Sequence, residues 1–218
     1  METSRDPARR PTALADAAFA ELRTDLLSGG PLTARGRIVA GELADRLRMS
    51  RTPVREALDR LARLGYLEAL EGGGYQRRRY RTRDVRDVYE LRLLLEPFAA
   101  ELAAGRSHEG GSSSGASFHV ALAHASGNRV LAHVVELLAE RVAAMRTDAA
   151  REGRGRPRPA DDREASLDHR RIAHMVARGD GDGARRAMDQ HLTAEARLLL
   201  LAQPASDEDD LARAAAER

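Results

Sequence analysis

The feature that most constrains the fold is a pair of short helical segments separated by a turn of only three residues. The first segment covers 41–47, the turn is Arg48-Met49-Ser50, and the second segment ends before Gly65. Ser50 is a favourable N-cap residue, and Pro53 lies in the first turn of the second segment, where its missing N–H costs nothing. Two helices joined this closely form a helix-turn-helix unit.

The segments around this pair complete a small domain. Residues 14–27 carry apolar side chains at helical spacing, so we predict another helix there. Residues 37–39 are short and extended. After the pair, two short strands, 66–70 and 75–77, flank the glycine turn at 71–74, which predicts a hairpin. The resulting expectation is a winged helix-turn-helix, α-helical with a small β-hairpin.

The remainder of the chain is also predicted to be helical. Aromatic residues make up 3% of the sequence, too few for a typical β-sandwich or barrel. Pro97 is expected either to kink or to divide the first of the predicted helices. These helices are predicted over 82–104, 116–125, 128–151, 163–177 and 184–201. The fold class is therefore mainly α, with the winged domain followed by an antiparallel helical bundle.

The predicted domain boundaries follow from these patterns. A Gly/Ser-rich stretch at 105–117 reads as a flexible linker within the helical part. We expect a disordered tail at 1–11, the winged domain at 12–77, a basic hinge at 78–83, a helical domain at 84–203, which the resemblance described below implies is an effector and dimerisation domain, and a C-terminal tail at 204–218.

Composition excludes several function classes. The chain has no cysteine, which excludes disulfides, thiol catalysis and Cys-ligated zinc. Its longest apolar runs, such as 198–202, are far below the ~20 residues of a membrane span. The charged N-terminus lacks the apolar core of a signal peptide. We therefore expect a cytoplasmic protein with no membrane partner.

Charge is distributed unevenly along the chain. The total formal charge is +2, but residues 1–83 carry 17 arginines and 11 acids, whereas residues 84–218 carry 19 arginines and 23 acids. The first part is thus positive by six and the second negative by four. Such an asymmetry favours a polyanionic partner for the first part.

The second helix of the pair carries the candidate DNA contacts. Arg51 and Arg55 are four residues apart, so they share one helix face and can each offer a bidentate fork to guanine or phosphate. The hydroxyls of Ser50 and Thr52 can bond phosphate. The alternative is a solvated face with internal ion pairs, Arg55–Asp59 and Glu56–Arg60. The candidate DNA-binding residues are Ser50, Arg51, Thr52, Pro53, Arg55, Gly73, Gly74 and Arg77.

The same residues resemble a known family. The stretch Gly41-Glu42-Leu43-Ala44, the run from Met49 to Leu58 (MSRTPVREAL) and Gly65-Tyr66-Leu67 resemble the helix-turn-helix of the GntR family. By position, the resemblance implies that Arg51 and Arg55 read bases, that Ser50 and Thr52 hold phosphate, and that Gly73 or Gly74 forms the wing tip. It also implies double-stranded DNA with a palindromic operator, bound by a homodimer. Gly41 differs from those family members that have a charged, DNA-contacting residue at this position.

The second half resembles the FCD effector domain of the FadR-type branch. The resemblance rests on Asp87–Arg92, Leu95-Glu96-Pro97, Phe118-His119, Ser126-Gly127-Asn128, Asp168–Ile172, Gly179-Asp180, Ala184–Met188 and His191-Leu192. It implies an antiparallel helical bundle that holds a divalent metal through one Asp and three His and binds a small carboxylate. By position the histidines are His119, His169 and His191, and the expected Asp is replaced by Gly115.

Three imidazoles from different helices can form a metal site without that acid. Such a set binds zinc or nickel and leaves positions open for water or ligand. The alternative for each histidine is a packing or surface role. Glu109 is a further candidate ligand, on the glycine-rich segment. A divalent metal is therefore the expected cofactor, although Gly115 removes the anionic ligand.

These features lead to one expected function and two alternatives. We expect a sequence-specific DNA-binding transcription regulator, a repressor, that responds to a small organic acid, a divalent metal or both. The first alternative is a constitutive dimeric DNA binder with a degenerate sensor domain. The second is a metal-dependent enzyme with a DNA-binding appendage. No general base, phosphate loop or nucleophile motif accompanies the histidines in the sequence, so we expect no enzyme.

Overall fold

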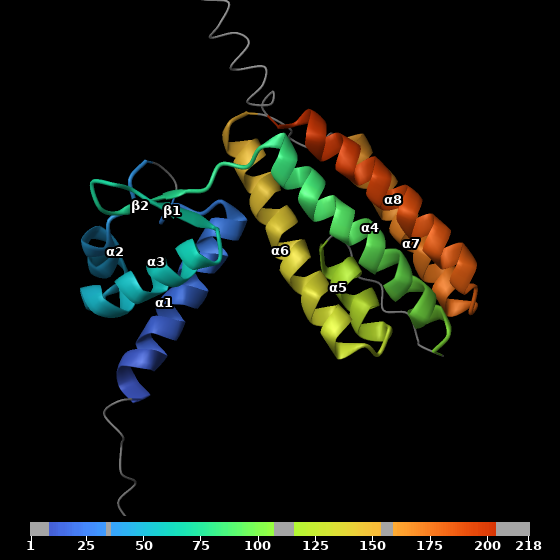
Figure 1. Cartoon of the computed structure of the whole chain (residues 1–218), viewed down its shortest axis with the longest axis horizontal. Coiled ribbons are helices and arrows are strands. Elements are labelled where there is room, and N and C mark those ends of the chain that lie inside the picture. The colour runs from blue at the N-terminus through green and yellow to red at the C-terminus, as the bar shows by residue number, and fades with distance from the viewer. Residues whose placement is uncertain (1–8, 34–35, 107–115, 154–158, 204–218) are drawn as a thin grey trace, which may run out of the picture. The chain divides into compact units, whose positions relative to one another are not determined.

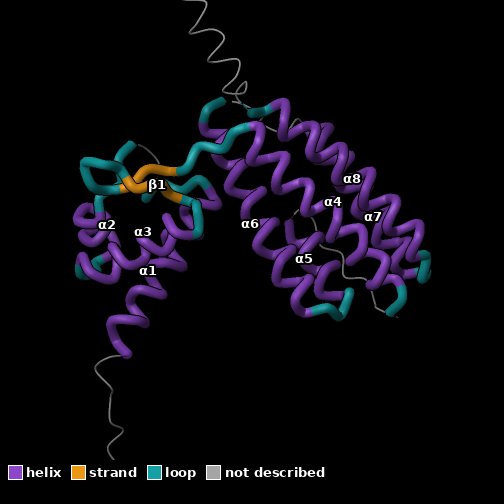
Figure 2. The backbone as a smooth tube through the Cα atoms, viewed as in Figure 1, coloured by secondary structure: helices purple, strands orange, loops and turns teal. Residues whose placement is uncertain are grey.

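The computed structural model describes residues 9–33, 36–106, 116–153 and 159–203. These residues fold into two compact units, divided between Arg79 and Tyr80. Helices dominate both units, and within the described residues the strands are confined to a short hairpin in the first (Figure 2). The predicted fold class, mainly α with a small β-hairpin, is confirmed.

The first unit has the predicted order of elements (Figure 1). They are α1 (Arg9–Ser28), α2 (Ala40–Leu47), α3 (Arg51–Arg63), β1 (Leu67–Ala69) and β2 (Tyr75–Arg77). Helix α1 begins at Arg9, earlier than predicted, and so includes the last three residues of the segment expected to be a disordered tail. The other elements agree with the predictions to within one or two residues.

The first unit is held together by the packing of α1 on α3. The apolar stripe of α1 and the opposite face of α3 are both buried, through Ala18, Leu22, Leu26, Val54, Leu58 and Leu61. Arg60 of α3 forms an ion pair with Asp16 at 2.9 Å and lies over the ring of Phe19 at 4.0 Å. Because one face of α3 is buried against α1, its opposite face is exposed to solvent.

The hairpin is antiparallel, with Leu67 opposite Arg77. Ile38 extends it by exchanging two backbone hydrogen bonds with Tyr75, at 2.6 and 2.9 Å. The predicted extended stretch at 37–39 thus lies along the wing. The Tyr75 hydroxyl donates to Asp59 at 2.5 Å, which ties the wing to α3.

The second unit consists of five helices among the described residues. They are α4 (Thr82–Ala104), α5 (Ala116–Ala125), α6 (Arg129–Arg151), α7 (Pro159–Ala177) and α8 (Gly181–Leu201). Pro97 does not divide α4, which is continuous across it. Helix α8 begins three residues before the predicted start because Asp180 caps it, its carboxylate accepting the Gly183 N–H at 2.8 Å.

Helix α4 lies at the centre of this unit and packs against the four other helices. Helix α8 runs antiparallel to it (Figure 1). Small side chains let α4, α5 and α6 approach closely in the core, which contains Ala99, Ala123, Leu131, Ala132 and Val135. Most of the predicted flexible stretch, including Gly115 and Glu109, lies outside the described residues. None of the described helices is long and apolar enough to span a membrane.

Candidate nucleic-acid interface and candidate metal centre

The exposed face of α3 presents two arginines with no internal partner. Arg51 and Arg55 are both exposed, and neither side chain forms a hydrogen bond or ion pair with a described residue. The Arg55–Asp59 pair of the alternative interpretation does not form, and Asp59 instead accepts from Tyr75. Arg60 likewise pairs with Asp16. Two unpaired guanidinium groups on one face can bind an anionic or base-edge surface.

The start of α3 adds further donors to this face. Ser50 occupies the N-cap position with an extended backbone, as predicted, but its hydroxyl makes no capping bond. Ser50 and Thr52 are exposed, whereas Pro53 is buried. The two hydroxyls and the first backbone N–H groups of α3 therefore remain available to a phosphate.

Gly41 of α2 lies beside this face. A Cβ built on Gly41 would lie 3.6 Å from Nε of Arg51, in ordinary van der Waals contact, so the guanidinium group of Arg51 lies directly beside Gly41.

The wing turn requires glycine. Gly73 and Gly74 have φ angles of 80° and 77°, a left-handed conformation that residues with a Cβ rarely adopt. Arg77, predicted to contact DNA, instead donates to the Thr33 hydroxyl at 2.8 Å and to the Leu26 carbonyl. Its part-buried guanidinium group therefore fastens β2 to the turn after α1.

The three predicted metal ligands meet inside the second unit. His119 of α5, His169 of α7 and His191 of α8 are all buried, with one ring nitrogen of each within 4.8 Å of the others. Nε2 of His169 lies 3.0 Å from Nε2 of His191. Two nitrogens bound to one metal at about 2.0–2.1 Å are about 3 Å apart when the angle at the metal is near 90°. The spacing of this pair thus fits a shared ion.

The protonation and bonding of the cluster also fit a metal. Burial, followed by the neighbouring His119 and His191, lowers the pKa of His169 to about 3. Burial also lowers the pKa of His191. These rings are neutral at pH 7 and keep a lone pair. His119 Nε2 is buried with no hydrogen-bond partner among the described residues, so its lone pair is available to a metal ion.

Two carboxylates orient two of the three histidines. Glu96 lies 2.6 Å from His119 Nδ1, and Asp168 lies 3.3 Å from His191 Nδ1. A carboxylate on one ring nitrogen fixes the tautomer and leaves the other nitrogen free to bind metal. Sequence reasoning missed both acids. Asp168 could have been found as the residue next to His169, but Glu96 lies on another helix and gives no sequence signal of this role.

A buried charge network lies behind Glu96. Arg92 is 2% exposed and pairs with Glu96 at 2.5 Å and with Glu195 at 2.6 Å. Arg146 also pairs with Glu195, and the Tyr89 hydroxyl donates to it at 3.0 Å. Burial alone would raise the pKa of Glu195, but Arg92 and Arg146 outweigh burial and lower it. The cationic and anionic groups here satisfy one another.

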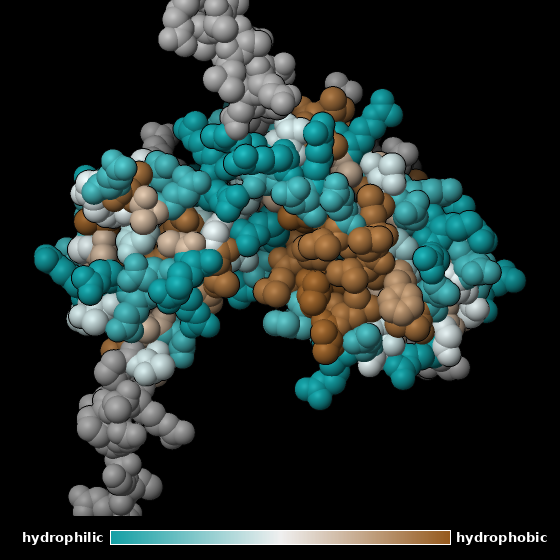
Figure 3. All heavy atoms as spheres, in the orientation of Figure 1, coloured by the Kyte–Doolittle hydropathy of each residue, from teal (hydrophilic) through white to brown (hydrophobic). Residues whose placement is uncertain are grey.

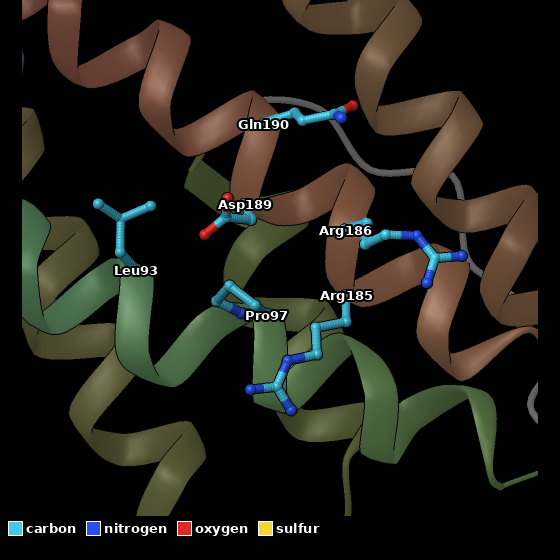
Figure 4. A pocket seen from close by; sticks show the side chains of 6 residues that line it. All are labelled: Leu93, Pro97, Arg185, Arg186, Asp189 and Gln190. Carbon is cyan, nitrogen blue, oxygen red and sulfur yellow. The ribbon is translucent and has the colours of Figure 1, made fainter.

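A hollow between α4 and α8 lies apart from this cluster. Figure 4 shows its lining residues, which are Leu93, Pro97, Arg185, Arg186, Asp189 and Gln190. Pro97 has no N–H, so the Leu93 carbonyl loses its intrahelical partner at this place. Arg185 is engaged by Glu101 at 2.6 Å. None of the three histidines lines the hollow.

Two sequence families match successive parts of the chain. Residues 14–76 match the family described as bacterial regulatory proteins, gntR family. Residues 109–194 match the FCD domain. The chain belongs to the GntR family. It is a transcriptional regulator of that family, with an FCD domain behind its helix-turn-helix domain, and the resemblance read from the sequence is confirmed.

Named relatives of this GntR chain are regulators. The HTH-type transcriptional regulator LutR of Bacillus subtilis is 29% identical over 190 residues, which cover 69% of this chain and 85% of LutR. A probable D-xylose utilization operon transcriptional repressor of Paenarthrobacter nicotinovorans is 29% identical over 74% of this chain and 80% of the relative. The Nta operon transcriptional regulator of Aminobacter aminovorans is 44% identical over 71 residues, about a third of each protein.

A solved structure has the same fold. McbR/YncC of E. coli aligns with a TM-score of 0.68 and 21% identity, over 85% of this GntR chain and 96% of that chain. This likeness supports the arrangement of a winged domain and a helical domain in one chain.

Proposed function

We propose that this GntR chain is a cytoplasmic, sequence-specific DNA-binding repressor without catalytic activity. The observation that carries the proposal is the pair of exposed, unpartnered arginines, Arg51 and Arg55, on the outer face of α3. In helix-turn-helix proteins the second helix of the pair enters the major groove and its N-terminal residues reach the bases. Ser50 and Thr52, at the start of α3, hold the adjacent phosphates in this proposal.

The proposed repressor acts as a homodimer on a palindromic operator. GntR-family regulators bind DNA and are typically dimeric. Figure 3 shows apolar atoms gathered in one patch over α4 and α6 of the second unit. The exposed large apolar residues of these two helices are Leu91, Leu94, Phe98, Val130 and Leu137. We assign this surface to the second copy, because a contiguous apolar patch on a folded domain marks an interface.

The proposed cofactor is a divalent metal, zinc or nickel, held by His119, His169 and His191. The buried cluster and the orphaned Nε2 of His119 support it. A bound ion joins α5, α7 and α8 at one point and offers open coordination positions to an anionic ligand. Glu96 and Asp168 hold the rings of His119 and His191 in the required orientation.

A small organic acid is the proposed effector of the same site. One observation favours the alternative of a constitutive binder. Arg92, the buried cation beside the cluster, is already paired with Glu96 and Glu195, so an incoming carboxylate finds no free guanidinium group there. An effector acid therefore binds through the metal, and a chain without metal is a constitutive regulator.

The DNA proposal is tested by selecting duplexes from a random library with the full chain. Arg51→Ala and Arg55→Ala each weaken binding to the selected duplex by about 1–3 kcal/mol, as expected for the loss of a guanine contact. Arg63→Ala removes an exposed arginine from the far end of α3 and is the control. Enrichment of no sequence, or unchanged affinity of both variants, contradicts the proposal.

The metal proposal is tested by elemental mass spectrometry on protein purified without a His-tag. We expect about one metal ion per chain in the wild type, and none in His169→Ala. Thermal unfolding with organic acids, with and without Zn²⁺, then identifies an effector. Absence of metal after incubation with Zn²⁺ contradicts the proposed metal-dependent sensor and favours the constitutive DNA binder.

A further inference from the structure

The tip of the wing is the turn Leu70–Gly74, which has three consecutive glycines after the exposed Glu71. The turn is closed by hydrogen bonds from Gly73 N–H to the Leu70 carbonyl at 2.8 Å and from Leu70 N–H to the Gly74 carbonyl at 3.0 Å. A three-glycine turn allows another molecule to approach the backbone closely. A feature of this kind needs a charged group beside it to hold a polyanion.

The chain segment before α2 reaches this tip. Ile38 pairs with Tyr75 in both directions, and a Cβ on Gly74 would lie 2.8 Å from the Ile38 carbonyl oxygen. Only glycine fits at 74 with this approach. Because Ile38 is locked to the wing, the residue before it, Arg37, is placed alongside the glycine turn.

The side chain of Arg37 lies across the turn. Its guanidinium group donates to the Gly72 carbonyl, and a Cβ on Gly74 would lie 3.1 Å from its Nε. A Cβ on Gly73 would lie 3.5 Å from its Nη2. Arg37 remains exposed, and the Gly72 bond is its one hydrogen bond to a described residue. A guanidinium group has five N–H donors, so most of those of Arg37 have no partner among the described residues.

Arg37, and not Arg77, is the arginine that lies against the glycine turn. Arg77 is turned inward to Thr33 and Leu26. Gln76, next to it on β2, donates to Glu68 at 3.1 Å. The cation at the glycine tip therefore comes from the segment before α2, in front of the helix-turn-helix.

We propose that Arg37 enters the minor groove of DNA beside the half-site read by α3, supported by the glycine turn. The inference rests on the proposed DNA-binding function. The minor groove is about 6 Å wide and admits a thin backbone turn and a flat guanidinium group. Narrow A·T-rich minor grooves have enhanced negative potential and attract arginine. Arg37 thereby selects A·T pairs next to each half-site, at positions that α3 does not reach.

The experiment uses the full chain and a duplex that it selects from a random library. Base pairs flanking each half-site are made A·T, inosine·C or G·C. Inosine·C lacks the N2 amino group of guanine, so it offers the minor groove of A·T with a different major groove. Wild-type protein binds the A·T and inosine·C duplexes equally, and binds the G·C duplex at least about fivefold more weakly. Arg37→Ala binds all three duplexes with the affinity of the G·C duplex.

Control variants separate charge from position. Arg63→Ala removes one charge elsewhere in the unit and keeps the wild-type discrimination. Arg37→Lys keeps the charge but loses the planar fork, and it retains part of the discrimination. Equal thermal unfolding of the three variants excludes a folding defect, and if Arg37→Ala unfolds early, Arg37→Lys alone decides the result.

The outcomes are distinct. Discrimination of A·T over G·C that persists in Arg37→Ala, or a wild-type preference that does not extend to inosine·C, overturns the role of Arg37 while the DNA-binding function stands. A library that yields no enriched duplex overturns the DNA-binding function and the inference with it.

Discussion

Tyr75 connects the wing to the recognition helix through a single side-chain bond. Its hydroxyl donates to Asp59 of α3 at 2.5 Å, while its backbone pairs with Ile38. Burial, and then the adjacent Asp59 carboxylate, raise the pKa of Tyr75 to about 12 from its usual 10. The neutral phenol is thus part of what fixes the wing on α3.

This pKa predicts a loss of stability in alkali. The unfolded chain releases the Tyr75 proton near pH 10, before the folded chain does, so the contribution is complete below pH 10 and declines as pH rises towards 12. Urea unfolding at pH 9, 10 and 11 measures the decline. Tyr75→Phe has a smaller decline over the same range. An identical decline in both proteins contradicts the assignment.

The sequence predicts the placement of some side chains but not of others. The motif places Arg51 and Arg55 on the exposed face because the buried face of α3 is fixed by Val54 and Leu58. The sequence does not reveal the contacts of Arg77, because nothing local shows that Thr33 and the Leu26 carbonyl, more than forty residues away, lie within its reach. The direction of a side chain in a short strand such as β2 depends on tertiary contacts that local periodicity does not contain.

Between elements, the buried ion pairs of α4 and α8 carry more stability than the exposed one. Glu195 of α8 pairs with the fully buried Arg92 of α4, whereas Glu101 of α4 pairs with the exposed Arg185 of α8. We expect Glu195→Gln to lower the free energy of unfolding by about 3 kcal/mol, because it removes one of the two carboxylates that neutralise the buried Arg92.

Glu101→Gln is the matched control for this prediction. Glu101 also joins α4 to α8, and Glu101→Gln makes the same chemical change in a solvent-exposed ion pair. It is expected to lower the free energy of unfolding by less than about 1 kcal/mol. Urea unfolding of the two variants at pH 7 gives the comparison. Equal costs would mean that the buried network does not hold α8 on α4.

The wing makes a second element-scale prediction. Gly74→Ala places a Cβ 2.8 Å from the Ile38 carbonyl and forces alanine to a φ of 77°. We expect the left-handed backbone to lower the free energy of unfolding by about 1–2 kcal/mol, and the overlap with Ile38 to lower it by about 1–3 kcal/mol more. Gly36→Ala, at a φ of 62° with nothing within 4 Å, is expected to show the first cost alone. Thermal unfolding compares the two, and equal losses would contradict the overlap.

Element boundaries show why periodicity predicts helices better than their ends. The 3.6-residue apolar repeat gives α4 and α6 to within a residue, because packing on the core follows from that repeat. The start of α8 is set by one carboxylate, that of Asp180, which accepts the Gly183 N–H. The three histidines meet because α5, α7 and α8 each turn a buried face to one core, while Glu96 joins them from α4.

At the scale of the whole molecule, the two units differ in charge as their proposed tasks require. The first unit, residues 1–79, carries 15 arginines and 11 acids, whereas the second unit, residues 80–218, carries 21 arginines and 23 acids. A positive first unit binds a polyanion, whereas an acidic second unit is repelled from DNA and is left to contact protein. The remaining question for the assembly is which surface of the second unit meets its copy.

In the proposed homodimer the apolar face of α4 provides that surface, and Leu94 tests it. Leu94 is 71% exposed and is flanked on the same face by Leu91 and Phe98. Leu94→Glu removes little packing within one chain, so monomer unfolding stays unchanged, but two glutamates facing each other in a dimer cannot be desolvated. Sedimentation equilibrium is expected to show a dimer for the wild type and a monomer for the variant.

Leu167→Glu is the control, since Leu167 is 53% exposed on α7, on a different helix, and its variant is expected to remain dimeric. DNA binding reports the same change independently. A dimer engages two half-sites with a gain from effective concentration, whereas a monomer binds a palindrome no better than a single half-site. Leu94→Glu should therefore keep its half-site affinity and lose the palindrome advantage. A dimeric Leu94→Glu variant would place the interface elsewhere, and a monomeric wild type would contradict the proposed homodimer.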